Sequence, residues 1–347
     1  MYRRAYLPTY VRCLVTAPVL CFVVEAFCPS LLSLHRSLAF CVRVFLQDEM
    51  AAEVLKEYLL RWRRDERGRS LTSTAARTTS VALELPRSFR PHRIVPLVYL
   101  GALKDVADAW ALHQRLLPEE LLLTVSTCSR SSTPMLEMRE LLPVRTPRKA
   151  GVAPRVQRLA VCSWERLSEL VHNLSGGATS QAGAEKGVRE TAAWLRHSLE
   201  SRSFLGDGDS AEVPSRETAA GGGGTGLVYL KLCLPWRDEP AFPAREHFVV
   251  ATALMQAVVN GLGKAVVCHC VAGASRSVTL VCAYLLRCCC SGGDAAGRAH
   301  GGAAEEAVKT VLEFVREVRL CACPNEGFMQ QLTEYASLLL SANNRLT

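Results

Sequence analysis

Residues 265–287 contain an apolar segment, a short loop of small residues and a helical pattern in direct succession. Ala265–Cys268 is a continuous apolar run, as expected for a strand buried on both faces. Ser275–Arg287 has helical spacing, with inward positions at Val278, Val281, Leu285 and Leu286. A loop this short places the first turn of the helix against the end of the strand. The chain must therefore contain at least one layer of helix packed on sheet.

The same alternation of strands and helices continues on both sides of this unit. We expect strands at 121–126 and 227–232, and a short strand pair or a strand plus a turn at 94–101. Helical spacing is predicted at 102–116, 246–262, 304–318 and 327–340, and Gly261 and Gly263 are expected to close the second of these helices. The predicted fold class is α/β, with a central, mostly parallel sheet flanked by helices.

Two stretches interrupt this pattern. Residues 129–225 combine Pro, Ser and charged clusters with a run of four glycines at 221–224, and we interpret them as a long insertion. Helical patterning is found there only at 158–174 and 188–205, so we expect the insertion to be partly helical and partly disordered. A second, Gly- and Ala-rich insertion is predicted at about 288–303.

Residues 1–93 differ from the rest and are predicted to form an N-terminal hydrophobic segment and a basic linker, before the α/β domain at 94–343. Residues 13–34 carry one charge, Glu25, and are long enough to cross a bilayer. Three interpretations of residues 1–49 stay open: a membrane anchor, an organelle-targeting segment, or an over-extended start with Met50 as the true beginning. Membrane association is therefore an open alternative to a cytoplasmic location.

The formal net charge of +8 is concentrated between Arg61 and Arg93, where nine arginines face three acids. Only Trp62 and Phe89 accompany them as aromatic residues, so we expect a solvated or docking segment rather than a nucleic-acid interface. The 15 cysteines are an odd number, and their spacings suit neither a disulfide framework nor a zinc site. Free thiols in a reducing compartment are the simpler interpretation.

The loop at 269–277 carries the residues for a specific chemistry. Successive backbone N–H groups and a helix N-terminus form a cradle for a tetrahedral anion, and Arg276 can bind two of its oxygens at once. The same field stabilises a thiolate at Cys270, which can then attack phosphorus. The residues expected to bind the phosphate are Val271, Ala272, Gly273, Ala274, Ser275 and Arg276.

Three further residues are assigned supporting roles. Ser277 can donate a hydrogen bond toward the Cys270 sulfur and help it leave from a covalent intermediate. His269 is expected behind the loop, orienting it through ring hydrogen bonds. The leaving oxygen needs a proton, and Asp238 is the preferred general acid because it follows a predicted strand and one long helix separates it from the cysteine. Glu239 is the rival acid.

The segment HCVAGASRS resembles the signature of the dual-specificity phosphatases, within the cysteine-dependent protein tyrosine phosphatase superfamily. The resemblance extends to residues 94–108, to Asp238 in the position of the family's general acid, and to Pro324–Phe328 at the start of the closing helix. It covers about 94–128 and 226–343. It implies a protein tyrosine phosphatase-like fold and no cofactor or metal. Asn325 is expected either to brace the phosphate loop or simply to cap the helix.

Three functional hypotheses follow. The first is a protein phosphatase for phosphotyrosine and phosphoserine or phosphothreonine, with phosphoproteins as partners; mitogen-activated protein kinases are candidate substrates by analogy alone. The second is a phosphatase of a non-protein phosphate ester, which the absence of Lys in the loop disfavours. The third is a phosphoprotein-binding pseudophosphatase, which the presence of Cys270, Arg276 and Asp238 together disfavours.

Overall fold

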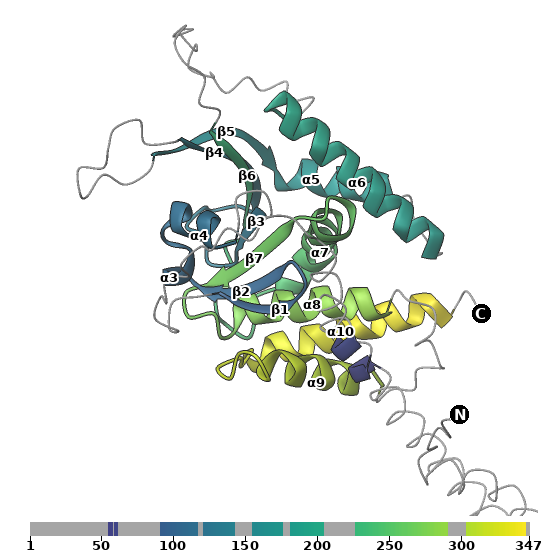
Figure 1. Cartoon of the computed structure of the whole chain (residues 1–347). Coiled ribbons are helices and arrows are strands. Elements are labelled where there is room, and N and C mark those ends of the chain that lie inside the picture. The colour runs from purple at the N-terminus through teal and green to yellow at the C-terminus, as the bar shows by residue number, and fades with distance from the viewer. Residues whose placement is uncertain are drawn as a thin grey trace, which may run out of the picture. The chain divides into compact units, whose positions relative to one another are not determined.

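The computed structural model describes residues 55–57, 59–61, 91–116, 121–142, 155–175, 181–204, 226–290 and 303–344 (Figure 1). The hydrophobic segment at 13–34, the basic stretch at 62–90 and residues 291–302 of the second predicted insertion lie outside the described residues. Within the described ranges, no helix has both the length and the apolarity needed to cross a membrane.

The centre of the molecule is a mixed sheet of seven strands in the order β1-β2-β7-β3-β6-β4-β5 (Figure 1). The four inner strands, β2, β7, β3 and β6, are parallel to one another. The outer pairs are antiparallel. The prediction of a central, mostly parallel sheet is confirmed for the inner strands, and antiparallel strands at both edges make the whole sheet mixed. The strand bounds are β1(His92–Val95), β2(Val98–Ala102), β3(Leu121–Ser126), β4(Met135–Leu142), β5(Arg155–Ser163), β6(Leu227–Cys233) and β7(Ala265–Cys270).

The inner strands follow directly from the apolar runs in the sequence. All six residues of β7 are buried, and β3 begins and ends where the sequence predicted it. The register brings their carboxyl ends to one edge of the sheet, because Ala102 pairs with Cys270 and Ser126 pairs with both His269 and Cys233. Loops that leave four different strands therefore meet at this edge, as in other open α/β sheets.

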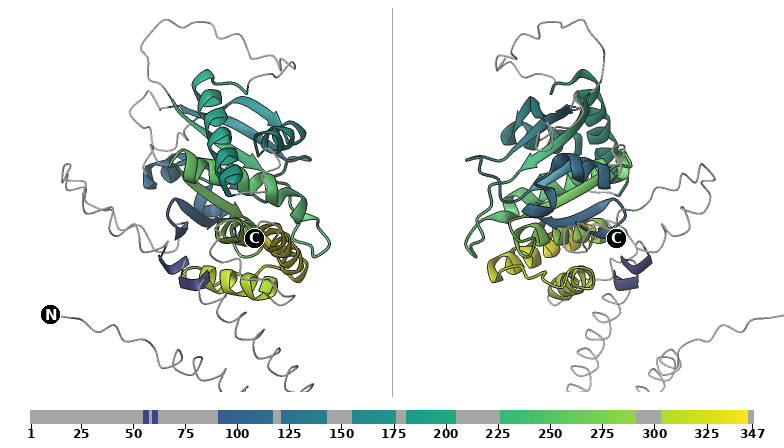
Figure 2. Two further views of the ribbon diagram at one scale, coloured as in Figure 1. Left: turned by 90° about the vertical axis from the view of Figure 1, so that its right-hand side faces the viewer. Right: turned by 60° about the vertical axis from the view of Figure 1, so that its left-hand side comes forward.

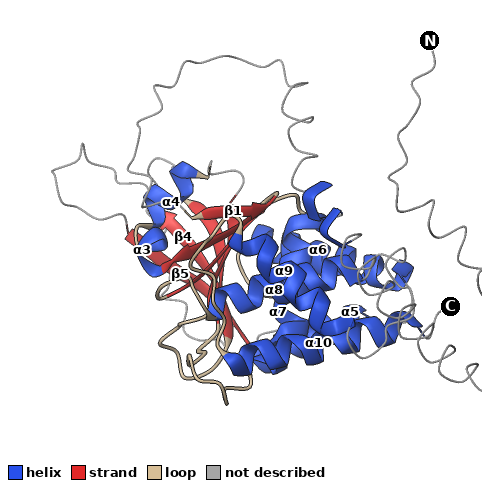
Figure 3. Ribbon diagram, turned by 90° about the horizontal axis from the view of Figure 1, so that it is seen from below, coloured by secondary structure: helices blue, strands red, loops and turns tan. Residues whose placement is uncertain are grey.

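Helices cover the two faces of the sheet unequally. Figure 3 shows α3(Leu103–Val106) and α4(Ala109–Arg115) on one side of the strands and the remaining helices on the other. Strand β7 contributes side chains to both faces of the sheet. Ala265 and Val267 pack with Leu112 of α4, whereas Val266 and Cys268 belong to the larger core. That larger core also contains Leu55 and Leu59 from the described residues near the N-terminus.

The large helical layer contains the helices that the sequence predicted after residue 246. The bounds are η2(Ala244–His247), α7(Phe248–Gln256), the π-helical turn η3(Ala257–Gly261), α8(Arg276–Cys290), α9(Ala303–Arg316) and α10(Glu326–Asn344). Figure 2 shows α9 and α10 side by side, and both contact α8. Gly263, with φ of +63°, ends the α7–η3 helix, as predicted from its place in the sequence.

Two predicted helices are wrong in their bounds. The helix expected at 102–116 is interrupted, because Asp108 accepts a hydrogen bond from the Ala111 N–H (2.9 Å) and starts α4 as a separate helix. The helix expected at 158–174 begins only with α5(Trp164–Ser175), since residues 158–163 belong to β5. Short apolar runs fit helix or strand equally, and here pairing with β4 decides.

The stretch interpreted as an insertion thus extends the sheet. Strand β4 pairs with β6, β5 pairs with β4, and α6(Gln181–Ser201) packs against both α5 and η3. The helix predicted at 188–205 corresponds to α6, which starts earlier. Inserted residues are therefore joined to the central sheet and to the helical layer behind the candidate site.

Candidate active site

Cys270 is the last residue of β7, and Arg276 is the first residue of α8. The loop between them turns sharply at Gly273, whose φ is +68°. A Cβ at Gly273 would lie 2.4 Å from the Gly101 carbonyl oxygen, so both the backbone angle and the space require glycine. The strand–loop–helix unit predicted from the sequence is confirmed.

The Cys270 sulfur is buried and is the acceptor of two hydrogen bonds. The Gly273 N–H donates to Sγ at 3.1 Å, and the Ser277 hydroxyl donates to it at 3.3 Å. Burial raises the pKa of Cys270, but hydrogen bonds from Ser277, Gly273 and Ala274 outweigh it, so the net pKa lies below the ordinary value of a thiol. The structure therefore favours a thiolate here.

The backbone carbonyl oxygens of the loop also accept hydrogen bonds, which come from residues outside it. The Leu103 N–H donates to the Val271 oxygen (3.1 Å), and the Cys323 N–H donates to the Ala274 oxygen (2.7 Å). Arg319, which is buried, donates through Nε to the Gly273 oxygen and through Nη2 to the Ala272 oxygen (2.9 Å). With its carbonyls bound from outside, the loop can turn its N–H groups toward the position of an anion.

Asp238 lies in the exposed segment between β6 and η2, as the sequence predicted. Its Oδ1 accepts from the Ser275 hydroxyl at 2.7 Å and from Asn325 Nδ2 at 3.1 Å. Its Oδ2 lies 3.4 Å from Arg276 Nε. Glu239 instead pairs with exposed Arg237 at 3.5 Å. The geometry thus places Asp238, rather than its rival, against the phosphate loop.

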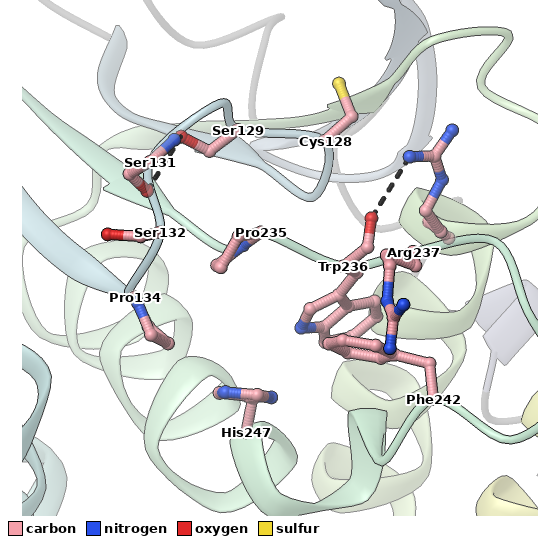
Figure 4. Close-up of a pocket in the computed structure, with 11 residues that line it drawn as sticks. Cys128, Ser129, Ser131, Ser132, Pro134, Pro235, Trp236, Arg237, Phe242 and His247 are labelled. Atoms are coloured by element: carbon pink, nitrogen blue, oxygen red, sulfur yellow. Dashed lines mark hydrogen bonds between the residues drawn. The ribbon is translucent and has the colours of Figure 1, made fainter.

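Arg276 joins the loop to the segment that carries the acid. Its Nη1 donates to the Trp236 carbonyl oxygen at 3.1 Å, which Figure 4 shows as a dashed line. This guanidinium lies beside Asp238 as well, so one side chain contacts both parts of the site. Val271 and Ala272 are exposed, and the mouth of the loop is accordingly open.

Asn325 makes hydrogen bonds both to its own helix and to the residues around the loop. Its Oδ1 accepts from the Phe328 N–H at 2.9 Å and so caps α10. Its Nδ2 donates to Asp238, and its backbone N–H donates to the Ser275 hydroxyl at 3.3 Å. The cap of α10 is therefore also a brace between the acid and the phosphate loop.

His269 lies within β7 and is buried. Burial, with the nearby Lys231 charge, lowers the pKa of His269 to about 4, against the opposing effect of a hydrogen bond with the Cys270 backbone. The ring is therefore neutral near pH 7 and a weak base. The backbone carbonyl oxygen of His269 accepts hydrogen bonds from both the N–H (3.0 Å) and the hydroxyl (3.1 Å) of Thr127, which fixes the end of β7 against β3.

The neighbouring cysteines differ from Cys270. Burial raises the pKa of Cys268 and raises that of Cys282 to about 12, with Arg316 opposing it in the second case. Burial also raises the pKa of Cys128, which is half-buried beside Arg276. Among these thiols, Cys270 alone is shifted toward the ionised form.

Comparison with known proteins identifies this arrangement. Residues 226–296 match the family model described as "Dual specificity phosphatase, catalytic domain", and this range contains Asp238, Cys270, Arg276 and Ser277. Within this range the chain is similar to the catalytic domain of dual-specificity phosphatases. The resemblance found in the sequence is thereby confirmed.

The curated relatives match a limited part of this chain. Dual specificity protein phosphatase 22 of Homo sapiens is 35% identical over 110 residues, which is 32% of this chain and 50% of the relative. The Xenopus tropicalis protein of the same name is 36% identical over 111 residues, covering 32% and 44%. The chain thus spans about half the length of these curated relatives.

Solved structures match the chain at low identity. Human DUSP28 is 20% identical, with a TM-score of 0.35, covering 74% of this chain and 97% of that structure. The Yvh1 phosphatase domain from Chaetomium thermophilum is 17% identical, with a TM-score of 0.38, covering 72% and 95%.

The structure brings all the predicted site residues to one edge of the sheet, although their catalytic roles stay predictions. Sequence reasoning missed Arg319 and its link to His92, whose Nδ1 lies 3.2 Å from Arg319 Nη1. Arg319 lies 46 positions from Gly273 and among other charged residues. No local signal distinguishes it from a solvated arginine.

Proposed function

We propose that the chain is a protein phosphatase that hydrolyses phosphotyrosine and phosphoserine or phosphothreonine monoesters through a phosphocysteine intermediate. The observation that carries this proposal is the environment of the Cys270 sulfur, which accepts hydrogen bonds from Gly273 and Ser277 and has a lowered pKa. A stabilised thiolate next to Arg276 and Asp238 is the set of groups that phosphoryl transfer to sulfur requires.

The first chemical step transfers the phosphoryl group. The Cys270 thiolate attacks phosphorus, a sulfur–phosphorus bond forms, and the bond from phosphorus to the substrate oxygen breaks. Asp238 in its acid form gives its proton to that oxygen, and the dephosphorylated hydroxyl group leaves. The loop N–H groups and Arg276 bind the phosphoryl oxygens as charge builds on them.

The second step restores the enzyme. The Asp238 carboxylate accepts a proton from water, the resulting hydroxide attacks phosphorus, and the sulfur–phosphorus bond breaks. Inorganic phosphate is released and Cys270 returns as a thiolate, which the Ser277 hydroxyl stabilises as it leaves. Every bond and proton is accounted for by the chain, the substrate and water, so the proposed reaction needs no metal and no cofactor.

Phosphoproteins are the proposed substrates and partners, with mitogen-activated protein kinases as candidates by family analogy. The basic stretch at 61–93 would suit an acidic docking surface on such a kinase. A role in signalling from the cytoplasm accords with this proposal, because an ionised cysteine nucleophile needs a reducing compartment. A non-protein phosphate ester is disfavoured by the uncharged loop residues Val271, Ala272 and Ala274.

The decisive experiment measures hydrolysis of a small aryl phosphate by the full chain and by Cys270→Ser. We expect turnover by the wild type, its complete loss in the variant, and no effect of a metal chelator. Cys321→Ser is the matched control, because Cys321 is an exposed free thiol in a neighbouring segment.

A second readout separates an enzyme from a binding module. Alkylation of Cys270, followed by peptide mass analysis, should proceed at a lower pH than alkylation of Cys321. Ordinary thiol behaviour at Cys270, or aryl phosphate turnover that survives in Cys270→Ser, would overturn the proposal. A wild-type chain that binds phosphopeptide without turnover would instead establish a pseudophosphatase.

A further inference from the structure

A cavity of about 520 Å³ lies beside the phosphate loop (Figure 4). It is lined by residues 128, 129, 131, 132 and 134, which follow β3, and by residues 235–237 and 242 of the segment that carries Asp238. Arg276 lines both this cavity and the phosphate site, whereas neither Asp238 nor any residue of 270–275 lines it. The cavity is therefore next to the reacting group, not the place where the reacting phosphate lies.

The cavity contains a hydrogen-bond donor without an acceptor. Trp236 is 2% exposed, and its Nε1 has no hydrogen-bond partner among the described residues. Figure 4 shows this nitrogen on the edge of the indole that faces Pro134, Pro235 and His247. An indole N–H can only donate, and leaving it unpaired in a buried place costs free energy. A ligand of this cavity should bring an oxygen acceptor to that depth.

The walls of the cavity favour a flat, largely apolar side chain. They include the rings of Trp236, Phe242 and His247 and two prolines. The rest of the lining consists of Cys128, of serines at 129, 131 and 132, and of Arg237 and Arg276. Burial lowers the pKa of His247, so this ring is neutral at pH 7. No carboxylate lines the cavity. Aromatic rings and prolines pack well against another aromatic ring.

We propose that this cavity binds an unphosphorylated tyrosine of the substrate, close in sequence to the residue being dephosphorylated. Its ring would pack against Phe242 and the prolines, and its phenolic oxygen would accept the hydrogen bond from Trp236 Nε1. This inference rests on the proposed protein phosphatase function, and it names a feature that selects among phosphoprotein substrates.

The test uses peptides that carry a non-hydrolysable phosphonate at the reacting position, so that binding is measured without turnover. Tyr, Phe, Glu or Ala is placed in turn at each neighbouring position on either side. We expect one position at which the Tyr peptide binds the full-length wild type about fivefold more tightly than the Phe peptide, the typical effect of one hydrogen bond. In Trp236→Phe, which removes the donor and keeps a ring, the two affinities should become equal.

Trp194→Phe is the matched control, because Trp194 of α6 stacks on Phe204 and does not line the cavity. This variant should keep the Tyr-over-Phe preference. Should Trp236→Phe fail to fold, the indole N–H resonance of Trp236 in the wild type provides the readout, since it should shift with the Tyr peptide and not with the Phe peptide.

Three results would overturn the inference: equal Tyr and Phe affinities at every position in the wild type, a preference that persists in Trp236→Phe, or tightest binding of the Glu peptide. Aryl phosphate hydrolysis, measured in parallel, keeps the two proposals apart. Hydrolysis without Tyr selection removes only the cavity inference, whereas Tyr selection without hydrolysis removes the enzymatic proposal and leaves a phosphopeptide-binding site.

Discussion

The two segments that form the site are held in opposite ways. The phosphate loop at 270–276 has its carbonyl oxygens bound from outside by Arg319, Leu103 and Cys323, and its central Gly273 is buried. The segment that carries Asp238 is exposed from residue 237 to residue 241. Trp236 is buried at one end of this segment, and at the other end the Phe242 oxygen accepts from Gln331 (2.8 Å).

This difference matches what each segment must do in the proposed reaction. The nucleophile and the anion cradle need one geometry in both chemical steps, and preorganised donors cost no rearrangement during reaction. The acid must reach an oxygen that changes with the substrate. In the described structure its contacts outside its own segment are polar ones to Ser275, Asn325 and Arg276, which a substrate can replace.

The comparison is tested most strongly by removing the acid while leaving the loop intact. Asp238→Ala should lower kcat for an aryl phosphate by about 10²–10⁴, because the leaving oxygen loses its proton donor. Phosphopeptide affinity and the alkylation rate of Cys270 should stay close to wild type. Steady-state kinetics and peptide binding provide the measurements.

Glu239→Ala is the matched control for this prediction. Glu239 is exposed and pairs with Arg237, so its loss should leave kcat nearly unchanged. An equal fall in kcat for both variants would show that charge on the segment, rather than a proton from Asp238, supports the reaction.

The second prediction loosens the loop without touching the acid. Arg319→Met should leave the Ala272 and Gly273 carbonyls without their buried donor and lower kcat/KM about 10- to 100-fold, since an unsatisfied buried group costs about 1–3 kcal/mol. Because Arg319 is a positioning residue, the pH profile of Cys270 alkylation should move to higher pH as well, which a loss of stability alone would not produce.

Arg316→Met is the control here, because Arg316 Nε binds the Ala322 oxygen (2.9 Å) near the same turn and does not reach the phosphate loop. It should keep both kcat/KM and the alkylation profile. An unchanged profile in Arg319→Met would mean that the loop holds its shape by its own turn geometry.

The sequence predicts the parts of the molecule that depend on a local pattern, and it fails where distant residues decide the structure. The bounds of β3 agree with the prediction at both ends, because a strand buried on both faces consists of a continuous run of apolar residues. The pattern of residues 158–163 permits either helix or strand, and only their pairing with β4 makes them part of β5.

The site shows the same limit. Cys270, Arg276 and Ser277 lie within eight residues of one another and follow from a local pattern, and Asp238 follows from its place after a strand. Arg319 acts through hydrogen bonds to residues that lie 46 and 47 positions earlier in the chain. Its side chain is buried, although a run of charged residues predicts exposure to solvent. A hydrogen bond from a side chain to a backbone carbonyl far away in the chain produces no pattern in the local sequence.

The smallest effect is expected from Ser277→Ala, which removes one hydroxyl donor from Cys270 Sγ and leaves the loop carbonyls bound. The pKa of Cys270 should rise, since this hydrogen bond lowers it, and the alkylation profile should move to higher pH with a loss in kcat of about tenfold at most. A thiolate favoured in the fold adds stability that is lost as pH falls through the lowered pKa, so the variant should also show a weaker rise of unfolding free energy with pH.

Thr279→Val removes a neighbouring hydroxyl that binds the Ser275 oxygen instead (3.0 Å), and its alkylation profile should match wild type. If both variants shifted the profile equally, the thiolate would depend on the helix start as a whole rather than on one aimed hydroxyl.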